Sequence, residues 1–237
     1  DLFGLAHKWL RHLPGGLGIA TVMACAVFAA ITGSSVACAV TIGAIAIPEM
    51  LSRGYQRPLV LGAVAAGGTL GILIPPSIPM ILYGAITDES IGKLFMSGVI
   101  PGVIMTAMFT AIVVYSSRNL PREEAASWDE RFEALKKSFW GLMLPVIVVG
   151  GIYTGIFTPT EAAGIGTVYS LFITFCVYKT LGFKDIPGIL NDTIKTTCMI
   201  FAIMIGASLF GFVLTILYAP QALTNYVAEL ETSRWVV

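Results

Sequence analysis

The chain has 237 residues, of which 56% are hydrophobic and only 12% are charged, and its mean hydropathy is +0.84. Soluble domains usually carry about 25% charged residues, so this composition excludes a water-soluble globular domain and indicates an integral membrane protein. The formal net charge is zero, which gives no reason to expect nucleic acid as a partner. The four cysteines lie in apolar segments without paired spacing, as is typical of small buried hydrophobic side chains.

The first 50 residues predict a short polar segment followed by a helical hairpin. Residues 1–16 hold two histidines and two basic residues and are expected on the cytoplasmic side. Residues 17–50 form two apolar arms of about 15 residues, roughly 22 Å each, whereas the hydrocarbon core of a bilayer is about 30 Å thick. The polar sequence Thr-Gly-Ser-Ser at 32–35 separates the arms. The lengths favour a re-entrant hairpin with its tip at 32–35 over the alternative, one long buried helix with a local weakness.

A second interruption lies in residues 58–86, within the sequence GGTLGILIPPSIPM at 67–80. Proline removes a backbone donor and displaces the residue before it from helical angles. Opened backbone at membrane depth is tolerated only where its amides and carbonyls face protein or a wet cavity. We therefore expect a transmembrane helix that is broken near Pro75 and Pro76, and the alternative is a simple kink.

The rest of the chain predicts further membrane helices and one strongly polar block. Residues 94–117 are apolar and long enough to span a bilayer. Residues 118–138 include five basic and five acidic side chains, with Trp128, Phe132, Leu135 and Phe139 at helical spacing. They predict an amphipathic helix on the cytoplasmic membrane surface, and the alternative is a loop helix packed on another subunit. Transmembrane helices are predicted at 139–157, 161–178 and 196–217, and residues 218–237 are expected to be the truncated tail of a longer subunit.

The basic residues agree with this topology. If the hairpin enters and leaves on one side and each later apolar segment crosses once, all but two of the 14 Lys and Arg residues share one side. The exceptions are Lys93 and Arg234. The positive-inside rule makes the rich side cytoplasmic. Two complete spans in place of the hairpin would also return the chain to the same side of the membrane, so that alternative stays open.

The two interruptions are the candidate ion site. The tip offers three hydroxyls, the free carbonyls of the arm that ends there and the free amides of the arm that begins there, which suit a cation and an anion respectively. Residues 13–48, 54–87, 94–117 and 138–160 contain no Asp, Glu or His, the usual proton carriers in membranes. The pattern therefore favours a hard cation such as Na⁺ over a proton, although close helix packing through small residues would also explain it.

The residue types in the sequence do not favour an enzymatic function. A serine hydrolase would need a base beside Ser34 or Ser35, and both histidines precede the first apolar arm. The sequence has no metal-ligand cluster and no phosphate loop, so no cofactor is expected beyond Na⁺ as coupling ion. Glu161 completes the pattern Thr158-Pro-Thr-Glu, which predicts a helix-capping box and not a ligand.

Three runs resemble a known family. They are ITGSSVACAVTIGAIAIPEMLSRGY, AAGGTLGILIPPSIPMILYGAITDESIGKLFMSGVIPG and GIFTPTEAAGIGTVYSL. They look like the large membrane subunit, of the DctM type, of tripartite ATP-independent periplasmic (TRAP) transporters. The resemblance implies an all-α, inverted-repeat elevator transporter in the bacterial inner membrane. It implies import of organic anions such as C4-dicarboxylates, sialic acid or related carboxylates on a Na⁺ gradient. The implied partners are a periplasmic substrate-binding protein and a small DctQ-type membrane subunit.

The family's site residues map onto the two interruptions. The resemblance implies a sodium site formed by residues of the tip and of the glycine-rich segment, namely Thr32, Gly33, Ser34, Ser35, Gly67, Gly68, Thr69 and Gly71. It implies that Ser35, Pro75, Pro76 and Ser77 form one wall of the substrate site. The second hairpin and the second cation site of the family are expected outside this chain. The alternative function is an ion channel or pore subunit with a filter of backbone carbonyls, and a purely structural subunit is a third possibility.

Overall fold

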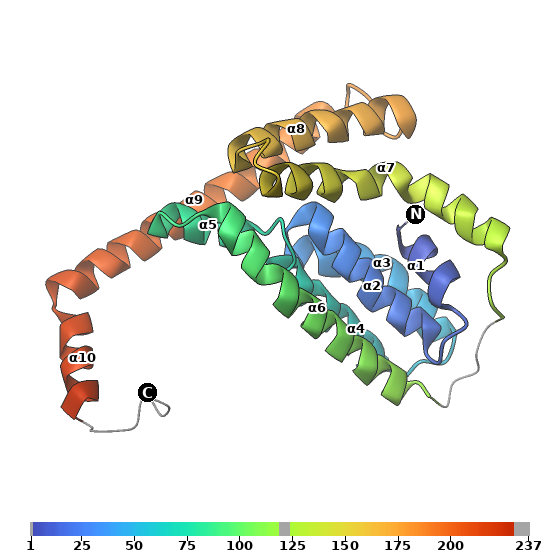
Figure 1. Cartoon of the computed structure of the whole chain (residues 1–237), viewed down its shortest axis with the longest axis horizontal. Helices are drawn as coiled ribbons and strands as arrows, with labels where there is room; N and C mark the ends of the chain where they lie inside the picture. Colours follow the sequence, from blue (N-terminus) through green and yellow to red (C-terminus); the bar gives the residue numbers. More distant parts are fainter. Residues whose placement is uncertain (1, 119–123, 230–237) are drawn as a thin grey trace. The chain divides into compact units, whose positions relative to one another are not determined.

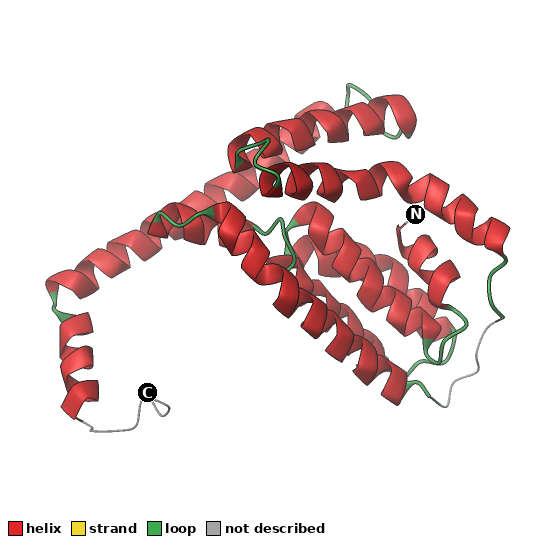
Figure 2. Ribbon diagram, in the orientation of Figure 1, coloured by secondary structure: helices red, strands yellow, loops and turns green. Residues whose placement is uncertain are grey.

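The protein is described by a computed structural model covering residues 2–118 and 124–229, and these residues form helices without any strand (Figure 2). The chain divides into two compact units, residues 1–178 and 179–237. The first unit contains, in order, α1 (Leu2–Leu10), α2 (Gly16–Thr32), α3 (Ser35–Ser52), α4 (Arg57–Thr69), η1 (Leu70–Ile72), α5 (Ile78–Thr87), α6 (Ile91–Ser116), α7 (Trp128–Tyr153), α8 (Pro159–Phe172) and η2 (Ile173–Val177). The second contains α9 (Ile186–Ile216) and α10 (Ala219–Glu229).

The prediction of an all-helical membrane protein is confirmed. Among the described residues, five helices are long and apolar enough to cross a membrane: α3, α6, α7, α8 together with η2, and α9. Most large apolar side chains of α6 and α9 are exposed, as expected where lipid or other protein replaces water.

Helices α2 and α3 pack against each other as a hairpin with a two-residue link (Figure 1). Gly33 ends α2 in a left-handed conformation (φ 61°), and its N–H donates to the Ala29 carbonyl at 2.8 Å. Ser34 is extended and begins α3, and its Oγ accepts a hydrogen bond from the Ala37 amide at 3.3 Å. A left-handed glycine followed by a serine cap is an efficient way to end one helix and start another.

The arms of this hairpin are longer than predicted. They contain 17 and 18 residues, or about 25 and 27 Å, because α2 begins at Gly16 and α3 continues through Pro48 to Ser52. Arm length alone therefore no longer separates a re-entrant hairpin from two short spans.

The predicted break is present between α4 and α5. Helix α4 tightens into the 3₁₀ turn η1, residues 73–77 are not helical, and α5 begins at Ile78. The bond between Pro75 and Pro76 is cis. The long helix α6 contacts α4, η1 and α5, so the two halves of the broken helix lie one after the other along it.

Three predicted boundaries differ from the structure. The segments 118–138 and 139–157 were predicted as separate elements, but α7 is one helix from Trp128 to Tyr153, because no breaker falls near residue 138. Helix α9 begins ten residues before the predicted start at 196, with Pro187 in its first turn, where a missing N–H costs nothing. Helix α10 occupies part of the predicted tail. The parts of these predictions at 119–123 and 230–237 lie outside the described residues.

Candidate functional site

The hairpin tip lies directly on the break in the broken helix. The Gly33 carbonyl accepts a hydrogen bond from the Ile78 amide, in the first turn of α5, at 3.3 Å. A Cβ built on Gly33 would lie 2.5 Å from the carbonyl oxygen of Pro76, too close for any side chain. The tip and the break are therefore in backbone contact, which only glycine at position 33 permits.

Three of the predicted site glycines form the surface against which the hairpin packs. A Cβ on Gly67 would meet the Cys25 thiol of α2 at 2.8 Å, and one on Gly68 would meet the Ala39 Cβ of α3 at 2.8 Å. A Cβ on Gly71 would lie 2.7 Å from the carbonyl carbon of Ser34. The glycines follow the hairpin toward its tip, so their evident role is close backbone approach.

The hydroxyls of Thr32 and Ser77 donate hydrogen bonds to backbone carbonyls close by in the sequence. Thr32 donates to the Phe28 carbonyl at 3.1 Å. Ser77 is fully buried and donates to the Ile72 carbonyl at 2.7 Å, across the break. A hydroxyl that donates locally still has oxygen lone pairs, which are the hard ligands that Na⁺ prefers. The Thr69 side chain is exposed and donates to the Ala66 carbonyl, so it lies apart from the packed glycine face.

The break also packs against the first half of α6. A Cβ on Gly98 would lie 2.6 Å from the Leu73 carbonyl oxygen, and one on Gly102 would lie 3.0 Å from Ile74. At the other end of α6, Val113 lies equally close to Gly18 of α2, and Ser117, just after α6, lies against Gly15, just before α2. Helix α2 thus starts level with the end of α6 and finishes near its middle.

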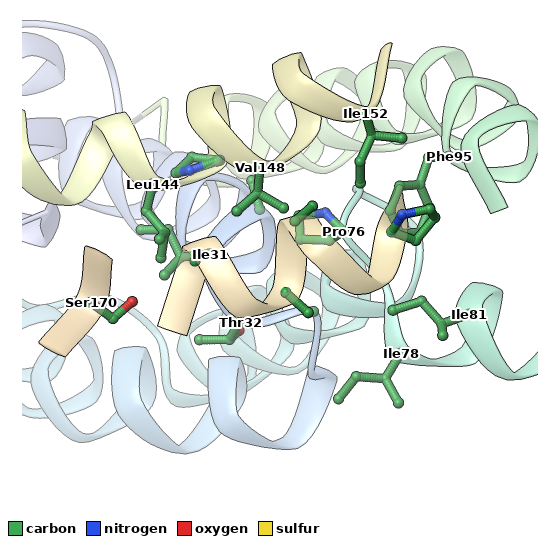
Figure 3. A pocket seen from close by; sticks show the side chains of 17 residues that line it. Ile31, Thr32, Pro76, Ile78, Ile81, Phe95, Leu144, Val148, Ile152 and Ser170 are labelled. Carbon is green, nitrogen blue, oxygen red and sulfur yellow. The ribbon is translucent and has the colours of Figure 1, made fainter. Parts of the chain in front are cut away.

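A cavity of about 220 Å³ opens beside the tip (Figure 3). Its lining comes from the end of α2, the break, α5, α6 and the pair α7–α8, and includes the labelled side chains Thr32, Pro76 and Ser170. Thr32 and Ser170 are the hydroxyl-bearing residues of this lining, and none of the lining residues is charged. Because no lining residue is charged, the ligands that this cavity could offer to an ion are hydroxyl and backbone carbonyl oxygens.

The structure brings together only part of the predicted site. Three predicted residues line this cavity, namely Thr32, Gly33 and Pro76. The remaining residues do not line it: Ser34, Ser35, Gly67, Gly68, Thr69, Gly71, Pro75 and Ser77. Of these, Ser34 and Ser35 contact Gly71 directly behind the tip, and Pro75 lines a separate cavity between α2 and α6.

Two contributors to the site carry no clear signal in the sequence pattern. The Ile78 amide binds the tip, and α8 contributes Gly166 and Ser170 to the cavity wall. The spacing of Gly98 and Gly102, four residues apart on an apolar helix, was a usable signal for close helix packing. The amide of Ile78 carries no sequence signal, because every residue except proline has one.

The capping box at the start of α8 is confirmed. The Thr158 Oγ1 accepts from the Glu161 amide at 3.3 Å, and the Glu161 carboxylate accepts from the Thr158 amide at 2.8 Å. Glu161 is thereby occupied at a helix start. Within the described ranges, no group of three or more His, Cys, Asp or Glu residues is placed to hold a metal ion.

The fold and the site together define an integral membrane protein in which a helical hairpin packs against a broken helix. The model of the family described as "Tripartite ATP-independent periplasmic transporter, DctM component" matches residues 1–237, and the chain belongs to this family. The prediction that the protein is a transporter component and not an enzyme is confirmed by this membership, as is the assignment to the inner membrane.

Characterised relatives differ in the solutes that their names state. The C4-dicarboxylate TRAP transporter large permease protein of Pseudomonas aeruginosa is 42% identical, over 99% of this chain and 56% of its own length. The ectoine permease protein of Halomonas elongata is 37% identical over 95% of this chain and 53% of its own length. The sialic acid permease protein of Vibrio cholerae is 35% identical over 100% of this chain and 56% of its own length. The chain thus spans about half the length of these relatives.

Proposed function

We propose that this chain forms half of the permease subunit of a Na⁺-coupled secondary transporter that imports organic anions. A periplasmic binding protein delivers the solute, and a small DctQ-type membrane subunit completes the complex. The observation that carries the proposal is the backbone contact between the hairpin tip and the break, at Gly33 and Ile78.

The position of this contact supports a re-entrant hairpin. Helix α6 has 26 residues, about 39 Å, which is enough to cross a bilayer. The break packs on Gly98 and Gly102, about 10 and 16 Å from the start of α6, whereas α2 starts level with its end. The first turns of α6 and all of α5 therefore continue beyond the tip. These lengths support the proposal that the hairpin is re-entrant.

The sodium site is proposed at the tip and the glycine-rich turn behind it. The ends of α2 and η1 both direct backbone carbonyls, with their partial negative charge, toward residues 32–35 and 70–73. The Thr32 Oγ1 keeps its lone pairs as hard ligands, and the carbonyls of Gly33 and Ser34, which accept from the amides of Ile78 and Cys38, each keep a second lone pair. Gly67, Gly68 and Gly71 support this site by allowing close approach, and Thr69 is its outermost member. The lack of Asp, Glu and His in residues 13–48 and 54–87 favours Na⁺ over a proton.

The solute is proposed to bind at the start of α3 and at the wall of the break beside it. The start of α3 at Ser35 carries the partial positive charge of a helix N-terminus, which suits a carboxylate. Pro75 and Pro76 shape the neighbouring wall, while Ser77 holds the break through Ile72. The relatives are named for C4-dicarboxylate, ectoine and sialic acid, which supports a small organic solute for this chain as well. Because tip and break are bonded, we propose that they move together as part of an elevator.

Transport by the full-length subunit tests this function directly. The subunit and its small partner are reconstituted into proteoliposomes, and uptake of a radiolabelled C4-dicarboxylate is measured with and without a Na⁺ gradient and the matching binding protein. We expect uptake only when both are present. Conductance without saturation in the absence of both would favour the channel alternative and overturn the carrier.

The site residues are tested in the same assay. Ser35→Ala and Thr32→Val remove hydroxyls at the tip and are expected to raise the Na⁺ concentration needed for half-maximal uptake. Thr87→Val, at the far end of α5, removes a hydroxyl that donates to the Tyr83 carbonyl and is the matched control. Unchanged Na⁺ dependence in both tip variants would refute the sodium site, even if uptake itself is sodium-driven.

A further inference from the structure

Helix α7 has different neighbours on the two sides of Pro145. Before the proline it packs on α1 and α2, where the Glu130 carboxylate lies 3.3 Å from the Arg11 guanidinium. Ser138 is only 2% exposed and lines a small cavity together with residues of α1, α2 and α3. After the proline, Val148 lines the tip cavity (Figure 3). The first part of α7 is therefore held against the hairpin, whereas the second part faces the tip across the cavity.

Helix α8 and η2 lie antiparallel to α7 and pack along it. A Cβ on Gly166 would lie 3.0 Å from the Val148 side chain. At the other end, the Tyr178 hydroxyl, just after η2, donates to the Lys137 carbonyl at 2.8 Å. Interpolation between these two contacts places the start of η2 level with about Gly141 of α7.

Both helices have an irregular backbone at this level. Pro145 has no N–H, so the Gly141 carbonyl lacks the amide to which it would bond in a regular helix. In η2 the hydrogen bonds span five residues instead of four, and the Tyr178 amide donates to the Ile173 carbonyl at 2.8 Å. A Cβ on Gly141 would meet nothing within 4 Å, so no neighbouring atom opposes a bend on that side. Prolines and π-helical turns are the positions at which helices bend sharply.

The parts of α7 and α8 beyond this level form one wall of the tip cavity. We call residues 146–172 the outer part of the pair. Its cavity face is uncharged and includes small residues such as Ala162, Ala163 and Gly166. The contacts of α8 are chiefly with α7 and η2, and residues 30–36 contain no charged side chain that could pair with the outer part. The outer part can therefore change its distance from the tip without breaking a strong contact.

We propose that the α7–α8 pair is a hinged wall, which bends at Gly141–Pro145 and at η2 so that its outer part opens and closes the tip cavity. Ile173 and Thr160 are 13 residues apart, or about 20 Å along a helix. A change of about 20° at the hinge, the size of an ordinary kink, moves Thr160 by about 7 Å. The inference rests on the proposed function, because it takes the tip and the break as the site that the moving wall exposes or covers.

The movement is measured as the distance between two spin labels on the full-length subunit, held in lipid nanodiscs after removal of the native cysteines. One label replaces Val36, which is 71% exposed in the first turn of α3, and the other replaces Thr160, which is also exposed. We expect two populations of distances, separated by about 7 Å. The reference pair joins Val36 to Lys136, exposed on the first part of α7, and should give one population.

Two outcomes of this measurement would overturn the hinge. A single population for both pairs would mean that the wall does not move. Two populations for both pairs would mean that α7 moves as one rigid rod.

Pro145→Ala locates the hinge. Alanine restores the amide that the Gly141 carbonyl lacks, which favours a straight helix, so the two populations of the Val36–Thr160 pair should merge into one. Pro48→Ala, at an exposed proline inside α3, is the matched control and should leave both populations in place. If both populations persist in Pro145→Ala as they do in the control, the hinge at Pro145 is refuted.

Distances and uptake together separate this inference from the proposed function. Uptake that does not depend on Na⁺ would refute sodium coupling, while two distance populations would still support the hinge. A single distance population with normal Na⁺-driven uptake would overturn the hinge and leave the proposed function in place.

Discussion

The contact between tip and break predicts that Gly33→Ala lowers the free energy of unfolding far more than the addition of one methyl group usually does. Alanine at φ 61° costs about 1–2 kcal/mol, because its Cβ crowds the following carbonyl in the left-handed region. The same Cβ would lie 2.5 Å from the Pro76 carbonyl oxygen, and relieving that overlap costs about 1–3 kcal/mol more. We expect a total loss of about 2–5 kcal/mol in the free energy of unfolding.

Gly54 separates the two contributions. It is also left-handed, with φ 80°, but a Cβ there meets nothing within 4 Å. Gly54→Ala should therefore lose only the conformational cost of about 1–2 kcal/mol. Thermal unfolding of both full-length variants in the same detergent measures the difference, and Na⁺-driven uptake measures its effect on the site. If the two variants lose equal stability, a side chain at position 33 does not clash with the Pro76 carbonyl, and the predicted contact between tip and break is wrong.

Three other changes test separate parts of the structure. Gly71→Ala should destabilise the subunit by about 1–3 kcal/mol through its contact with the tip backbone, whereas Gly62→Ala, with open space around it, should be neutral or stabilising in the same unfolding assay. Thr158→Ala should cost about 1 kcal/mol by removing the cap of α8, and no change on thermal unfolding would contradict the capping role. Burial, then the charges of neighbouring arginines, lowers the pKa of His7 below 6.5, so its unfolded state binds more protons near that pH. Stability should then be fully present above pH 6.5 and fall as the pH drops toward the folded pKa. This loss should disappear in His7→Gln and persist in the exposed control His12→Gln, as followed by melting temperature against pH.

Local sequence predicted the interruptions well because they depend on residue types with few conformational choices. Gly33 and Ser34 are a helix end and a helix start in adjacent positions, and Pro75 and Pro76 cannot continue a helix. The continuity of α7 was not predictable in this way. Polarity changes sharply near Ser138, but polarity determines which surface a helix faces and does not end it.

The site was harder to predict than the break. The family resemblance assigned Gly67, Gly68 and Gly71 to a sodium site, whereas the structure gives each a close contact with the α2–α3 hairpin. A sequence alone does not distinguish a glycine whose carbonyl binds an ion from a glycine whose missing side chain allows another helix to pack closely. The contacting residue decides between the two roles, and this residue, Ala39 for Gly68 and Ser34 for Gly71, lies 29 and 37 residues away along the chain.

The bond between Gly33 and Ile78 limits how the two elements can separate. Ile78 is the first residue of α5, and Pro79 after it has no N–H, so the tip carbonyl satisfies one of the few donors that this helix start possesses. Pulling the tip away would leave a donor and an acceptor without partners in an apolar setting, at about 1–3 kcal/mol for each group. A motion that exposes a solute to one side and then the other is therefore cheaper if hairpin and broken helix travel as one rigid block. In the proposed transport cycle, the hairpin would therefore move together with the broken helix and would not open separately as a gate.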